Sequence, residues 1–108
     1  MSERGVDVEA DLLIGLEVEN ARLLAYRHVR QCAEVRSVRA WERKDAASAS
    51  ALRELADLLL PNIQDAHARA SDFDHELDER LEHRNRYLRV KRPKVVALLD
   101  DEKPGPRT

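Results

Sequence analysis

The first forty residues carry apolar side chains on two opposite faces of one predicted helix. Residues 7–44 contain no proline and one glycine, so they can form a single helix about 55 Å long. One apolar stripe alternates steps of four and three residues, which is typical of a coiled-coil seam. A helix that buries both stripes needs a neighbour on each side, in a bundle or across a subunit interface. The seam stripe is Ile14, Val18, Ala21, Ala25, His28, Cys32 and Val35. The opposite stripe, which a simple hairpin leaves exposed and which is therefore a candidate interaction surface, is Leu12, Leu16, Leu23, Tyr26 and Trp41.

Two further helices are predicted after this one. Residues 45–50 are Asp, Ala and Ser, and their oxygens can accept the free amide hydrogens at a helix start. The next apolar run predicts a short helix over 50–60, which Pro61 ends because proline lacks an amide and clashes with the preceding turn. A narrow apolar stripe then predicts a long helix over 61–92. The stripe consists of Ile63, Ala66, Ala70, Phe73, Leu77, Leu81 and Leu88.

The chain after Pro93 holds a short apolar segment over 94–100. Five consecutive apolar residues must be shielded from water, and two interpretations of what shields them stay open. The segment docks on the protein's own core as a short helix or strand, or it reaches into a neighbouring chain. Residues 102–108 are predicted to be a disordered tail. The expected architecture is one all-α domain over 1–101, a long helical hairpin that forms an oligomeric helical bundle.

Composition agrees with an all-α fold. The 108 residues suit one domain, and 37% charged residues with 4% aromatics are typical of a solvated helical surface. Three glycines and four prolines leave little material for the turns of a β protein. No signal region and no apolar run of about 20 residues occurs, so we expect a cytoplasmic protein with no membrane partner. Cys32 has no second cysteine to pair with, and its position in the seam predicts a small buried hydrophobe.

A weak metal-ligand pattern lies on the long third helix. His75, Glu79 and His83 follow one another at four-residue intervals, the spacing of ligands on one helical face. That face lies opposite the apolar stripe, where Glu76 and Arg80 form an i,i+4 pair, so a salt-bridged surface is the better interpretation. We therefore expect no metal and no cofactor.

Catalytic chemistry has no recognisable motif in this chain. No Ser or Cys nucleophile matches a His and an acid at local spacing, and no Gly-rich phosphate loop is present. A histidine at position 28, within an apolar stripe, is more typical of structural packing than of a catalytic base. We therefore expect no enzyme activity.

Two layouts resemble known families without matching their motifs. Trp41-Glu42-Arg43, placed between two helices, resembles the Trp-x-Gly turn of helical-hairpin secretion substrates, but the glycine is missing. A long helix followed by two shorter ones is similar to the small all-helical chorismate mutases. That resemblance implies a dicarboxylate site lined by Arg and Lys, but the family's spacing does not match residue by residue, so no family is assigned. The arginines it would place there are Arg22, Arg27, Arg30 and Arg39.

Cations crowd the end of the third predicted helix. Basic residues near a helix carboxyl end complement its dipole, but six within residues 84–94 exceed that need. The patch fits an acidic protein face, or nucleic-acid phosphates with Tyr87 stacking on a base. The acidic run over 72–82 opposes a dedicated nucleic-acid binder. The patch comprises Arg84, Arg86, Tyr87, Arg89, Lys91, Arg92 and Lys94.

Charge also divides the first helix, because its first third is acidic and its later part is basic. An antiparallel neighbour would set the acidic end of one helix beside the basic end of the other. The sequence therefore predicts a non-enzymatic protein-protein interaction module: a homo-oligomeric adaptor, regulator or assembly component. A nucleic-acid-associated regulator that uses the basic end is the alternative, and a small enzyme with an Arg-lined site is the third interpretation.

Overall fold

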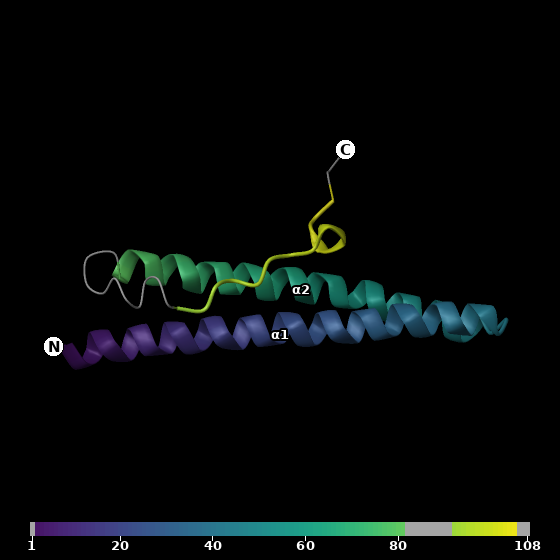
Figure 1. The fold of residues 1–108 in the computed structure, drawn as a ribbon, viewed down its shortest axis with the longest axis horizontal. Coiled ribbons are helices and arrows are strands. Elements are labelled where there is room, and N and C mark those ends of the chain that lie inside the picture. The colour runs from purple at the N-terminus through teal and green to yellow at the C-terminus, as the bar shows by residue number, and fades with distance from the viewer. Residues whose placement is uncertain (1, 82–91, 106–108) are drawn as a thin grey trace.

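Two long helices packed as a hairpin make up most of this protein. The computed structural model describes residues 2–81 and 92–105. Helix α1 (Ser2–Glu42) and helix α2 (Ala46–Leu81) run side by side in opposite directions, and a short 3-10 helix, η1 (Asp100–Glu102), follows (Figure 1). The described residues contain no strand. The all-α prediction and the long hairpin are confirmed, whereas the prediction of a separate short helix between two long ones is wrong.

The turn between the helices is shorter than predicted. Lys44 has φ 61°, a left-handed conformation usually taken by glycine at this position. The amide of Asp45 donates to the carbonyl of Ala40 at 2.9 Å, and the amide of Lys44 donates to the carbonyl of Trp41 at 3.0 Å, which together close α1 in a Schellman motif. The Asp45 carboxylate then accepts the amide of Ser48 at 3.1 Å and caps α2. Hydrogen bonds from Ser48 lower the pKa of Asp45.

Pro61 lies inside α2 and does not end it. The expected helices over 50–60 and 61–92 are one helix as far as Leu81, and the rest of that span, 82–91, lies outside the described residues. Proline removes one helical hydrogen bond, the one to the carbonyl four residues earlier. Pro61 and Asp57 are both exposed, so water can solvate the carbonyl that loses its partner. Burial of α2 against α1 on both sides of the proline outweighs the local penalty.

The hairpin core repeats every seven residues. On α2 the buried residues at this interval are small or aliphatic, and a seven-residue repeat is typical of a left-handed coiled coil. Leu12, Leu16 and Leu23 of α1 are buried against this face, so α2 covers the stripe that was expected to remain for a partner. Close approach is visible at Gly15, where a Cβ atom would lie 2.7 Å from the ring of Phe73. The buried heptad residues of α2 are Ala49, Ala56, Ile63, Ala70 and Leu77.

The segment after Pro93 is extended and lies along the hairpin, running in the same direction as α1 (Figure 1). Val95 packs against the cluster that contains Leu16 and Leu77. Val96 and Leu98 pack against the neighbouring cluster of Leu23, Ile63 and Ala66. The apolar segment therefore docks on the protein's own core, the first of the two interpretations, as extended backbone. Glu102, which was expected in a disordered tail, is buried in η1.

Candidate interaction surfaces

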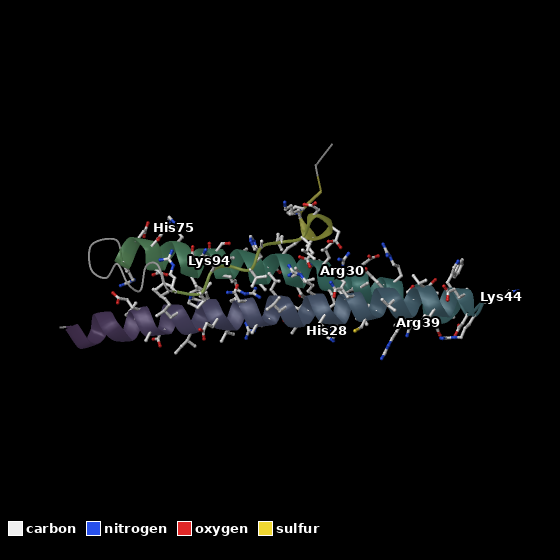
Figure 2. All side chains as sticks on the ribbon, viewed as in Figure 1. His28, Arg30, Arg39, Lys44, His75 and Lys94 are labelled. Carbon is white, nitrogen blue, oxygen red and sulfur yellow. The ribbon has the colours of Figure 1, made fainter. Side chains whose placement is uncertain are left out.

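The outer face of α1 carries the predicted seam, and α2 does not cover it. Ile14 is 59% exposed and Val35 is 51% exposed, and the residues between them on the stripe are exposed as well. Figure 2 shows His28 on the side of α1 that faces away from α2. Cys32 is exposed in the single chain, because α2 packs on the opposite, leucine-rich stripe. The prediction that Cys32 is buried is therefore wrong for the single chain. The exposed large apolar residues of α1 are Ile14, Val18, Leu24, Val29, Val35, Val38 and Trp41.

A shallow depression of about 340 Å³ lies on this outer face. Within it, the Cys32 Sγ and the His28 Nε2 are 3.8 Å apart, one helical turn from each other. All of its lining residues belong to α1, so a small molecule there would be contacted from one side only. The lining is His28, Gln31, Cys32, Val35, Arg36 and Arg39.

The hairpin tip presents a second apolar surface. Trp41 is 66% exposed, unlike Leu12 of the same predicted stripe, so it is available to a partner. It borders a depression of about 370 Å³, formed by α1 and the start of α2. Tryptophan beside arginine is a combination enriched at the energetic centres of protein interfaces. The residues that line this depression are Ser37, Val38, Trp41, Ala49, Ser50 and Arg53.

The inner side of α1 holds arginines that bind the C-terminal segment. Arg27 forms an ion pair with Glu102, and Arg30 donates to Asp101 at 2.9 Å. Two other arginines from the enzyme interpretation lie elsewhere: Arg22 pairs with Glu19 at 3.0 Å, and Arg39 is exposed on the outer face. The four arginines therefore do not share one site.

Sequence reasoning missed the polar residues in the hairpin's inner face. Glu19 and Asn20 are buried beside the leucines of α1, although the apolar pattern does not mark them. Glu19 accepts hydrogen bonds from Arg22 at 3.0 Å and from Arg69 at 2.9 Å, which joins the two helices. Asn20 binds the main chain of the C-terminal segment. The available signal was their position: both fall between Leu16 and Leu23, on the face that the leucines predict to be inside.

The weak metal-ligand candidates give a single surface pair in the described structure. His75 Nε2 lies 3.2 Å from Glu79 Oε1, and both side chains are exposed. His83 lies outside the described residues. In the part of the chain that the structure covers, no three His, Cys, Asp or Glu side chains form a group able to hold a metal ion. Figure 2 shows His75 near the C-terminal end of α2, far from the hairpin tip.

Most of the predicted basic patch falls in the span 82–91 and so lies outside the described residues. Its described member Arg92 binds acidic side chains of the same chain, Asp74 at 3.0 Å and Asp78 at 2.8 Å. One guanidinium nitrogen of Arg92 is buried without a hydrogen-bond partner. Lys94, also from this patch, is exposed. The patch members outside the description are Arg84, Arg86, Tyr87, Arg89 and Lys91.

No protein-family model, curated protein or solved structure matches this chain. Among the described residues, neither long helix contains an apolar stretch with the length and low charge needed to cross a membrane.

Proposed function

We propose that this protein is a non-enzymatic interaction module that pairs with a second copy of itself through the outer face of α1. The observation that carries the proposal is the exposed stripe from Ile14 to Val35, which keeps coiled-coil spacing although no part of the described chain covers it. Contiguous exposed apolar surface of this kind is typical of interfaces between proteins. The role that follows is that of a homo-oligomeric adaptor, regulator or assembly component.

Charge along α1 favours a second copy in the antiparallel orientation. Asp11 and Glu17 are exposed in the first half of the helix, while Arg36 and Arg39 are exposed in the second half. An antiparallel copy sets each acidic half over a basic half, whereas a parallel copy sets like charges together. The same patch then serves both partners, as a two-fold symmetric dimer requires.

The spacing of the stripe also gives a register for this pairing. If the two-fold axis passes between Tyr26 and Arg27, then Val18 of one copy lies level with Val35 of the other. Ala21 then lies level with Cys32 in the same arrangement. Valines fill the outer layers and small residues the next ones, and at the centre Ala25 lies level with His28 of the other copy.

The proposal is tested by placing charge in the seam. In the double variant Val18→Glu and Val35→Glu, two carboxylates would be buried in each half of the interface, so we expect the dimer to dissociate. Light scattering at micromolar concentration should give at least twice the mass of one chain for the wild type and one chain for the variant. Circular dichroism should show unchanged helicity, because both positions are exposed within the hairpin.

The matched control is Leu58→Glu, which changes an apolar residue that is 65% exposed on α2. This variant should keep the wild-type mass. A wild-type chain that scatters as a monomer, or a seam variant that stays dimeric, would contradict the proposal.

A further inference from the structure

The C-terminal segment is bound largely through its main chain. The Asn20 side-chain amide donates to the carbonyl of Lys94 at 2.9 Å, and its oxygen accepts the amide of Val96 at 3.0 Å. Arg27 donates to the carbonyl of Ala97 at 2.8 Å. These three contacts use groups that every extended peptide carries, in the manner of a strand added to a sheet edge. The surface that makes these contacts, called the groove below, therefore binds backbone groups that other extended segments also carry.

Side-chain selection in this groove comes from two apolar positions and one carboxylate pocket. Val96 and Leu98, two residues apart, face the same apolar cluster. Glu102 is 1% exposed, and its carboxylate accepts both the Arg27 Nε at 2.7 Å and a second Arg27 nitrogen. The Leu99 amide donates to the same carboxylate at 2.9 Å. Paired arginine contacts of this geometry recognise a carboxylate specifically.

The far end of the groove is formed by α2. The side-chain amide of Gln64 donates to the main-chain carbonyl of Glu102 at 2.9 Å. Main-chain recognition therefore continues from Asn20 on α1 to Gln64 on α2, across the whole docked segment. The chemistry that fits is an extended chain with an apolar residue and a second apolar residue two positions later, followed by a 3-10 turn that places a glutamate six positions after the first.

We propose that the groove marked by Asn20, Arg27 and Gln64 is a binding site for an extended acidic segment of a partner protein, and that the chain's own C-terminal segment is a resident competitor. Covalent attachment holds that segment at an effective concentration in the millimolar range, so a partner must bind tightly or be locally abundant. The groove and the outer seam lie on opposite faces of α1. The proposal therefore does not depend on self-association through the seam.

The test uses the full chain with its own segment weakened by Val96→Asp and Leu98→Asp, which leave the groove residues intact. The probe is a fluorescent peptide with the sequence of residues 92–104, and the readout is anisotropy. We expect saturable binding to the weakened chain and at least tenfold weaker binding to the wild type, where the resident segment competes. A peptide carrying Glu102→Gln should bind the weakened chain at least tenfold less tightly than the unmodified peptide.

Two substitutions in the weakened chain serve as matched controls. Arg27→Gln removes the carboxylate partner and should lower peptide affinity at least tenfold. Arg36→Gln changes an exposed arginine on the outer face and should leave peptide affinity unchanged. If the peptide fails to bind a weakened chain that keeps its helicity, or if the Glu102→Gln peptide binds equally well, the proposal is overturned.

A second measurement keeps the test decisive if the weakened chain does not fold. In the wild type, the amides of Val96 and Leu99 donate to side chains, which should slow their exchange with solvent. Excess unmodified peptide should speed exchange at both amides as the resident segment is displaced. Unchanged exchange at millimolar peptide would overturn the proposal. A wild-type dimer that Glu102→Gln dissociates and Val18→Glu leaves intact would assign the groove to a second copy's segment and overturn the partner assignment.

Discussion

At the scale of single residues, the ion pair between Arg27 and Glu102 shows how a buried charge stays charged. Burial raises the pKa of the Glu102 carboxyl, because the charged form loses water. The hydrogen bonds from Arg27 and from the Leu99 amide, with the attraction of the guanidinium, act in the opposite direction and leave this pKa below its ordinary 4.5. Repulsion from Asp101 opposes them only weakly. Glu102 therefore remains a carboxylate at neutral pH and anchors the C-terminal segment.

This lowered pKa gives a prediction for pH. A carboxyl whose pKa is lower in the folded chain stabilises the folded form above its unfolded pKa, and that contribution is lost as pH falls through the folded value. We therefore expect the C-terminal segment to stay docked at neutral pH and to release in acid, below pH 4.5. Amide resonances of Val96 and Leu99, followed during an acid titration, would report the release.

The control for the titration is the variant Glu102→Gln, which has no carboxyl to titrate. Its segment should bind more weakly at neutral pH and should lose the acid-dependent step. The same acid-dependent step in this variant would show that another group governs docking.

At the scale of elements, Pro61 decides how many helices the hairpin contains. Proline in a helix interior costs about 3 kcal/mol relative to alanine, while proline in the first turn of a helix costs little. The continuous helix α2 places Pro61 in the interior, with sixteen residues from Ala46 to its own position and twenty beyond it. The interpretation from the sequence, which divides this span into helices over 50–60 and 61–92, places it in a first turn. The two placements predict different effects of replacing it.

We predict that Pro61→Ala stabilises the protein by about 2 kcal/mol, the interior penalty less the loss of proline's stiffening of the unfolded chain. Urea denaturation would measure the change. Asn62→Ala is the control, because Asn62 is exposed in the same turn and its replacement should gain less than about 0.7 kcal/mol from helix propensity. A Pro61→Ala variant no more stable than the Asn62→Ala variant would support a first-turn proline.

Periodicity predicted the core face of α2, but on α1 it marked two stripes, and the one with the stricter spacing lies outside. Leu16, Leu23 and Leu77 are buried as their spacing requires, because the period of a helix is fixed by its backbone geometry. The break at Pro61 was wrong because packing along the whole hairpin outweighs one lost hydrogen bond. The buried Glu19 and Glu102 were not predicted, since their partners Arg69 and Arg27 are distant in sequence and meet only in the folded chain.

At the scale of the whole molecule, helix α1 serves two surfaces at once. Its inner face packs against α2 and the C-terminal segment, and its outer face carries an apolar stripe of coiled-coil spacing that nothing in the described chain covers. The described residues after α1 cover only the inner face of this 41-residue helix. A second copy would cover the outer face without any new sequence.

The orientation of such a dimer can be measured with the chain's only cysteine. In the proposed antiparallel register, Cys32 lies level with Ala21 of the other copy, whereas a parallel dimer sets Cys32 beside Cys32. We therefore predict that Ala21→Cys, under mild oxidation, forms a disulfide-linked dimer much faster than the wild type, with the bond joining positions 21 and 32.

Ala25→Cys is the control. It lies on the same stripe but is displaced by one helical turn, about 6 Å along the axis, which is beyond the reach of a disulfide to Cys32. Non-reducing electrophoresis and mass spectrometry of the linked fragments would identify the bond. Rapid linkage of Cys32 to Cys32 in the wild-type chain would instead require parallel helices, and the charge argument for the antiparallel dimer would then be wrong.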